Sequence, residues 1–279
     1  MIAMKNKYVG SLEHNTVERS FTDYIYSCYI PKKVENYILK FHQSSTLLKL
    51  PDSKHQSIDD NVIPWLEYAQ YTDITPDYYE QKINLNTSTE VNVIGSYRSF
   101  NKERKFNFEE LSQLLNDAFI RDKQKGSKKY GSAGALYPIV PLVLVFQDHD
   151  TLTRGVYVYD GIEQTLLKIK SWVKDEALHI KKYVCHDAID LPEICIAYAA
   201  DLRRSIIKYH IRGYRHALIE VGAMSQVFKN SLHKMSKGVG EVSWSGFNDN
   251  ELTKRCGLNV RLCPIVMLQW FGYTDSTGK

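Results

Sequence analysis

A helical stretch in the last third of the chain concentrates side chains that can move protons. The segment 205–222, SIIKYHIRGYRHALIEVG, is typical of a helix that buries one face. Within about two turns it places Lys208, Tyr209, Arg212, Arg215 and His216. Lys208 and Tyr209 are candidates for proton transfer, since a phenol beside a cation can act as a base. They could equally be a lysine with its stem on an apolar surface and an amphipathic tyrosine at the end of a core helix.

A second stretch, KKYGSAGALYP at 128–138, is suited to binding a flat ligand. Ser132, Ala133 and Gly134 precede a buried strand, and their small side chains let backbone amides and a hydroxyl reach a planar or phosphorylated ligand. The stretch lacks the Gly-Lys-Ser/Thr of a phosphate-binding loop and the Gly-x-Ser-x-Gly of a nucleophile elbow. A tight turn entering a strand is the other interpretation.

Two shorter motifs are compatible with the same kind of ligand. SYRSF at 96–100 sets Ser96 and Arg98 two residues apart, a pairing suited to a phosphate or to sugar-like hydroxyls. WSGFNDNEL at 244–252 places Gly246 between aromatic residues ahead of a short helix.

The elements that must position these residues follow from hydrophobic periodicity. Residues 107–119 have a polar entry and one apolar face, which predicts an amphipathic helix, and a second long helix is expected from Arg204 to Met235. Strands are expected at 139–146, 155–160, 193–200 and near 263–272. Long helices around apolar strands predict an α+β layered domain. Residues 1–90, where prolines interrupt the helical patterns, are expected to form a helical extension.

Composition excludes several classes of protein. The chain has 279 residues, 43% of them hydrophobic, and its net charge of +4 falls short of that of a dedicated nucleic-acid binder. No stretch has the length and apolarity of a signal peptide or a membrane span, so we expect a cytoplasmic protein without membrane contact. The five cysteines include no Cys-x-x-Cys pair and the nine histidines do not cluster, so neither a disulfide framework nor a metal site is predicted.

Taken in order, the motifs at 96–100, 128–138, 205–222 and 244–252 resemble those of the flavin-dependent nitroreductase superfamily. More narrowly, GSAGALYPI, GVYVYD and KYHIRGYRHALIEVGAMSQ are similar to the SagB/McbC-type dehydrogenases, which mature thiazole/oxazole-modified peptides. The resemblance covers about residues 91–272. It implies a layered α/β/α domain at 91–279 with a mixed, largely antiparallel sheet and a long central helix. Residues 1–90 would then be an extension with a possible docking role.

The resemblance also assigns cofactor contacts. Ser96 and Arg98 would hold the phosphate and ribityl chain of FMN. Ser132, Ala133 and Gly134 would line the isoalloxazine ring, and the amides of Ser245 and Gly246 would lie near its N5 edge. The chain departs from the family pattern at Gly95, where many relatives have arginine, at Gly131 in place of proline, and in a tail without the common basic phosphate ligands.

The resemblance makes Lys208 and Tyr209 a proton-transfer pair in the oxidation of peptide thiazolines or oxazolines to azoles. That reaction removes a proton from Cα and a hydride from Cβ, with FMN as the hydride acceptor and dioxygen as the final oxidant. A tyrosine with a pKa of about 10 needs a stabilising cation to act near neutral pH. We therefore expect Tyr209 to be the base and Lys208 to tune it, with the roles exchanged if Lys208 is neutral. Arg212, Arg215 and His216 are expected to serve helix packing.

The implied partners are a precursor peptide, a YcaO-type ATP-dependent cyclodehydratase and a leader-binding subunit, with a homodimer that binds flavin at its interface. Two other functions remain open at this point. The chain could be an FMN enzyme that reduces nitroaromatics or quinones with NAD(P)H. It could also be a non-catalytic scaffold in which flavin stabilises a synthetase assembly.

Overall fold

The computed structural model describes residues 20–48, 59–86, 94–184 and 191–274. The chain forms two compact units, Met1–Leu50 together with Ser96–Lys279, and Pro51–Gly95. The second unit contains a 3₁₀ turn, η1 (Asp60–Val62), and a short helix, α3 (Ile63–Ala69). The expected boundary at residue 90 lies near the end of this unit, whereas the preceding helices belong with the larger one. A docking role for residues 1–90 stays a prediction.

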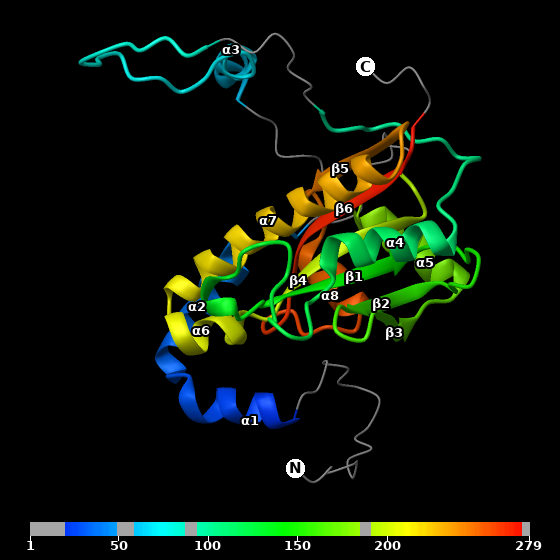
Figure 1. The fold of residues 1–279 in the computed structure, drawn as a ribbon. Helices are drawn as coiled ribbons and strands as arrows, with labels where there is room; N and C mark the ends of the chain where they lie inside the picture. The colour runs from blue at the N-terminus through cyan, green and yellow to red at the C-terminus, as the bar shows by residue number, and fades with distance from the viewer. Residues whose placement is uncertain (1–19, 49–58, 87–93, 185–190, 275–279) are drawn as a thin grey trace. The chain divides into compact units, whose positions relative to one another are not determined.

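A six-stranded antiparallel sheet forms the centre of the larger unit, in the order β3-β2-β1-β4-β6-β5 (Figure 1). Its strands are β1 (Ile139–Val145), β2 (Gly155–Asp160), β3 (Thr165–Ser171), β4 (Ile194–Ala200), β5 (Val239–Trp244) and β6 (Ile265–Tyr273). Each of the five strand pairings is antiparallel. The expectation of a largely antiparallel sheet is therefore confirmed, although the described strands include no parallel pair that would make it mixed.

Helices cover both faces of this sheet, because alternate residues of the central strands feed two separate cores. Val143 and Val145 belong to the core shared with α4 (Phe108–Phe119) and α7 (Arg212–Met235), whereas Leu142 and Leu144 belong to the core shared with α5 (Lys174–Val184) and α8 (Asp249–Arg255). This two-residue alternation is the period of a strand. The result is the layered α/β/α arrangement that the sequence predicted.

Helix α4 is positioned by its own sequence and by aromatic packing. Asn107 and Glu110 form a reciprocal capping box at its start. At its end Phe119 stacks on Phe228 of α7, with 5.7 Å between ring centroids. Three short helices lie at the start of α7, where α1 (Ser20–Tyr29) and α2 (Lys32–Ser44) pack on α6 (Leu202–Tyr209) (Figure 1). No helix in the described ranges is long and apolar enough to span a bilayer.

The prediction of one long helix from Arg204 to Met235 is wrong in one respect, because the structure contains two helices there. Helix α6 ends at Tyr209 and α7 begins at Arg212. Between them His210 adopts a φ of 48°, a left-handed conformation that a continuous right-handed helix does not contain. The break turns α7 back across α6 and leaves Lys208 and Tyr209 at a helix end.

The corner between α6 and α7 depends on Gly213. A Cβ at this position would lie 2.7 Å from the backbone carbonyl carbon and oxygen of Ser205, and neither backbone atom can move away cheaply. We expect Gly213→Ala to lower the free energy of unfolding by about 1–3 kcal/mol, measured by denaturant titration. Gly222→Ala, in the same helix with open space at its Cβ position, is the control and should not destabilise the protein. Equal stability of the two variants would contradict this account of the corner.

Candidate active site

The structure brings the loop at 132–137 against the Lys208–Tyr209 pair. Gly134 has a φ of 61° within the short 3₁₀ turn η2 (Ala133–Ala135). A Cβ built on Gly134 would lie 2.6 Å from Lys208 Nζ and 2.6 Å from Tyr209 Oη. Both reactive tips therefore meet at the backbone of one glycine. Two motifs that are distant in sequence therefore lie at one place in the fold, and their role in a flavin site stays a prediction.

Hydrogen bonds fix this loop on α6. The Tyr137 amide donates to Ser132 Oγ at 2.8 Å, and the Ala135 amide donates to the Ser132 carbonyl oxygen at 3.0 Å. At the start of α6 the Arg204 guanidinium donates to the Leu136 carbonyl oxygen. The loop is thus tied to the helix whose last turn carries the Lys208–Tyr209 pair.

The pair itself is open to solvent. Lys208 is exposed and Tyr209 is half-buried. Lys208 Nζ lies 5.4 Å from the centroid of the Tyr209 ring, and His216 of α7 meets that ring edge-on at 4.9 Å between centroids. The His216 contact was not foreseen, because the two residues lie on different helices and meet through the turn between α6 and α7. A substrate can reach this pair from solvent, and the ring of Tyr209 is held on one side.

Two charged groups beneath the loop were also missed. Burial raises the pKa of Glu220 on α7 to about 7. Burial, and then repulsion from Arg121, lowers the pKa of Lys128 to about 8. Lys128 Nζ lies 5.6 Å from the centroid of the Tyr130 ring and 5.5 Å from that of the Tyr137 ring. Hydrophobic periodicity and motif spacing gave no sign of either group, because side-chain burial depends on contacts distant in sequence.

Ser245 and Gly246 lie at the same end of the sheet as the loop. They follow Trp244, the last residue of β5, which pairs with Leu268 in the first half of β6. The first residues of β6 and β1 lie beside the last residues of β4, as the pairs Ile265–Ala199 and Ile139–Ala200 show. The loop and the β5 end therefore lie at the same end of the sheet, with β4 and β6 between the strands that carry them.

Ser96 and Arg98 lie at the opposite end of the strands. The amide of Tyr97, between them, donates to the carbonyl oxygen of Glu241 at 2.9 Å, and Glu241 pairs with Phe271. From Phe271 to Ile265, along β6, is a distance of about 20 Å at the rise of a strand. Within one chain these exposed residues do not converge with the loop.

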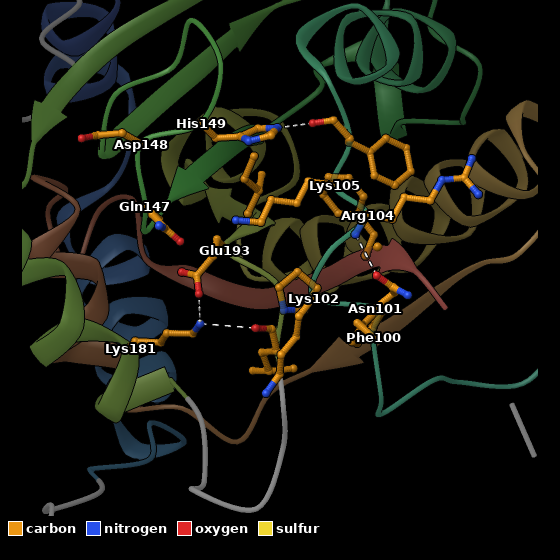
Figure 2. A pocket seen from close by; sticks show the side chains of 16 residues that line it. Phe100, Asn101, Lys102, Arg104, Lys105, Gln147, Asp148, His149, Lys181 and Glu193 are labelled. Carbon is orange, nitrogen blue, oxygen red and sulfur yellow. Dashed lines mark hydrogen bonds and ion pairs between the residues drawn. The ribbon is translucent and has the colours of Figure 1, made fainter. Parts of the chain in front are cut away.

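A separate cavity of about 340 Å³ lies near that opposite end (Figure 2). Basic side chains gather at its rim, and Lys181 forms an ion pair of 2.8 Å with Glu193. Apolar residues complete the wall, among them Phe100, Phe106 and Phe271. None of the residues predicted for the site lines this cavity.

Comparison with known proteins identifies the family. No family model matches the chain. A putative nitroreductase of Methanocaldococcus jannaschii is 30% identical over 161 residues, which cover 57% of this chain and 77% of that protein. The chain belongs to the nitroreductase superfamily and is an oxidoreductase of that fold.

Within the superfamily the chain is similar to the Microcin B17-processing protein McbC of Escherichia coli. The two are 26% identical over 201 residues, 66% of this chain and 72% of McbC. Among solved structures, the E. coli Microcin synthetase McbBCD complex with truncated pro-MccB17 bound contains a chain that aligns with a TM-score of 0.79 at 22% identity, over 93% of this chain and 99% of that one. A putative nitroreductase from Ralstonia eutropha aligns with a TM-score of 0.52 at 17% identity, over 70% of this chain and 89% of that one. The resemblance expected from the motifs is confirmed.

Proposed function

We propose that this protein oxidises thiazolines or oxazolines in a ribosomally made peptide to the aromatic azoles, with FMN as cofactor and dioxygen as the final oxidant. The observation that carries the proposal is the meeting of Lys208 Nζ and Tyr209 Oη at the backbone of Gly134. Similarity to McbC, a microcin-processing protein, supports this choice of substrate.

The residues at this end of the sheet fit a flavin. Gly134 is exposed and presents bare backbone, which a planar ring can approach closely. The amides after β5 lie at the same end of the sheet, and donors there would stabilise negative charge on a bound ring. When bound, FMN would supply the acceptor for the hydride that leaves Cβ of the azoline.

The side chains then have separate tasks. Tyr209 Oη takes the proton from Cα of the azoline ring, and the Lys208 ammonium stabilises the phenolate that this transfer requires. His216, edge-on to the Tyr209 ring, keeps the phenol oriented. Because the tips of Lys208 and Tyr209 both lie close to the backbone of Gly134, the azoline ring could be held between the base and the flavin.

We further propose that a second copy of the chain completes the cofactor site. Ser96 and Arg98, the expected phosphate ligands, lie at the opposite end of the strands from the loop, about 20 Å away along β6. One FMN bound within a single subunit would not need ligands so far apart. Helix α7 also exposes the apolar side chains of Leu218 and Ile219, and Ile211 is exposed just before it; Ile219 is 63% exposed. A homodimer through α7 would cover these residues and bring the two halves of the site together.

We expect Ile219→Glu to convert the dimer to a monomer and to release the flavin, because it buries a charge in the interface. Light scattering after size-exclusion chromatography measures the mass, and absorbance near 450 nm measures the cofactor. Ile162→Glu, at a site that is 43% exposed after β2, is the control and should change neither. A wild-type monomer that retains FMN would overturn the shared site.

By analogy with the solved synthetase complex, the protein would act in the cytoplasm beside a YcaO-type cyclodehydratase and a leader-binding subunit, on a precursor peptide. The exposed aromatic residues of the Pro51–Gly95 unit, such as Trp65 and Tyr71, supply apolar surface for docking.

The direct test is an anaerobic reaction. The purified protein should be yellow, release FMN on denaturation, and lose its flavin absorbance when mixed with an azoline peptide. Admission of air should restore the absorbance. A bound flavin that stays oxidised with several azoline peptides, or a colourless protein that cannot be loaded with FMN, contradicts the proposal.

The relative from Methanocaldococcus jannaschii favours a second candidate function, the reduction of nitroaromatics or quinones by NAD(P)H. In that case NAD(P)H alone should bleach the flavin rapidly, and a quinone should restore its absorbance. Bleaching by the peptide but not by NAD(P)H decides for the azoline reaction.

A further inference from the structure

The segment at the end of helix α2 contacts two parts of the larger unit that are distant in sequence. Its first contact is with α7, where Nδ1 of the buried His42 shares a hydrogen bond of 3.2 Å with the hydroxyl of Tyr214. The ring of Phe41 meets the same tyrosine edge-on, with 5.6 Å between ring centroids. Tyr214 lies in the first turn of α7, directly after the corner that follows the Lys208–Tyr209 pair. This contact therefore ties the end of α2 to the helix corner beside that pair.

The second contact of the segment is with the start of α8. The Leu47 amide donates to a carboxylate oxygen of Asp249 at 2.7 Å, and the Asp249 amide donates to the Leu47 carbonyl oxygen at 3.2 Å. The side-chain amide of Asn250 donates to Gln43 Oε1 at 3.3 Å. Asp249 is the first residue of α8 and follows Gly246 by three positions. This contact therefore ties the same segment to the turn after β5.

The chain between the two contacts is braced by its own hydrogen bonds. The amides of Ser45 and Thr46 donate to the carbonyl oxygens of His42 and Gln43, at 3.0 Å and 3.4 Å. The hydroxyls of the same two residues donate to the same two oxygens, each at 2.8 Å. We call Phe41–Leu47 the clasp. Because the clasp is short and braced, a displacement at one end is passed to the other.

We propose that the clasp is a positioning element of the active site, which fixes the Lys208–Tyr209 pair relative to the turn at Ser245–Gly246. A base and backbone donors that act on one ring must keep their separation, because a displacement of about 1 Å costs about 10²-fold in rate. The pair lies at the end of α6 and the turn follows β5, so the two need a link that neither motif contains. The catalytic consequence rests on the proposed function, and the proposal makes part of the expected N-terminal extension intrinsic to the site.

Hydrogen exchange tests the clasp by changing one of its ends and observing the other. Tyr214→Phe removes the hydroxyl that bonds His42 and keeps the ring, and the protection of the Leu47 amide should then fall by about threefold to tenfold. Asp249→Ala removes the acceptor for the Leu47 amide, and a fall of the same size is expected for the Gly213 amide, which donates to the His210 carbonyl oxygen at 3.0 Å. These factors correspond to the net contribution of one hydrogen bond.

Asp249→Asn is the matched control, because it removes the charge but keeps an acceptor oxygen for the Leu47 amide. The control is needed since Asp249 can also act on α7 through its charge. Burial raises the pKa of the Tyr214 phenol, and the charge of Asp249 adds to that rise. If the clasp carries the coupling, Asp249→Asn should retain the protection of the Gly213 amide. The Val143 amide, in the central strand β1, reports global stability and should keep its protection in every variant.

The proposal is overturned if either substitution lowers protection only at its own end, or if Asp249→Asn acts as Asp249→Ala does. An equal fall at Val143 would overturn it too, because the effect would then be a general loss of stability. Should Asp249→Ala not fold, Gln43→Ala takes its place, since it removes the hydrogen bonds to Asn250 and to the Val260 carbonyl oxygen.

The exchange measurement needs neither flavin nor peptide, so it can succeed where the azoline activity fails, and the reverse. In the active enzyme, the double variant of Tyr214→Phe and Asp249→Ala should lose no more rate than the slower single variant, because opening either end releases the clasp. Independent effects at the two sites would multiply. A multiplied loss would show that the clasp does not act as one unit.

Discussion

Replacing Tyr209 with phenylalanine is expected to slow azole formation about 10²–10⁴-fold, the usual contribution of a positioned acid or base. The phenyl ring retains the edge-on contact with His216, so the fold and the flavin should remain. Lys208→Met should have a similar effect, because it removes the cation that stabilises the phenolate. Single-turnover reduction of bound FMN by an azoline peptide is the measurement.

The control for this prediction is Tyr24→Phe, since Tyr24 is 63% exposed on α1. It should react as the wild type does. If Tyr209→Phe and Lys208→Met, or the alanine variants of both residues, support normal azole yield while flavin stays bound, the protein is a scaffold and not the oxidase. A loss of flavin in these variants would instead show that the pair holds the cofactor.

Gly134→Ala is expected to lower the same rate by about 10²-fold, the effect of displacing reactive groups by about 1 Å. The new Cβ would stand 2.6 Å from both Lys208 Nζ and Tyr209 Oη, and these flexible tips must move apart to admit it. Because the tips can move, the cost in stability should be only the roughly 1–2 kcal/mol of a non-glycine residue at a φ of 61°. Activity should therefore fall far more than the free energy of unfolding.

Gly131→Ala is the matched control, because Gly131 immediately precedes the loop and has nothing within 4 Å of its Cβ position. Kinetics and denaturant titrations of both variants, run side by side, separate displacement of the pair from general damage to the loop. Equal rates for the two variants would show that the tips of Lys208 and Tyr209 need not meet at Gly134 during the reaction.

Much of the fold was determined by the sequence itself, because its signals are local. Asn107 and Glu110 lie three residues apart and close their capping box without help from the rest of the chain. The apolar run of β1 predicted a buried strand, and in the structure both of its faces are packed. The loop at Gly134 and the pair at Lys208 could be paired in advance only through the family resemblance.

Tertiary structure decided the rest. The left-handed φ of His210, which breaks the expected helix, is not encoded by a glycine and depends on the packing of α6 against α7 at Gly213. The burial of Glu220 and Lys128 beneath the loop likewise follows from contacts between distant segments, which hydrophobic periodicity does not report. A sequence pattern fixes which face of an element is apolar, but desolvation, and with it the charge of a buried group, is a property of everything packed around that group.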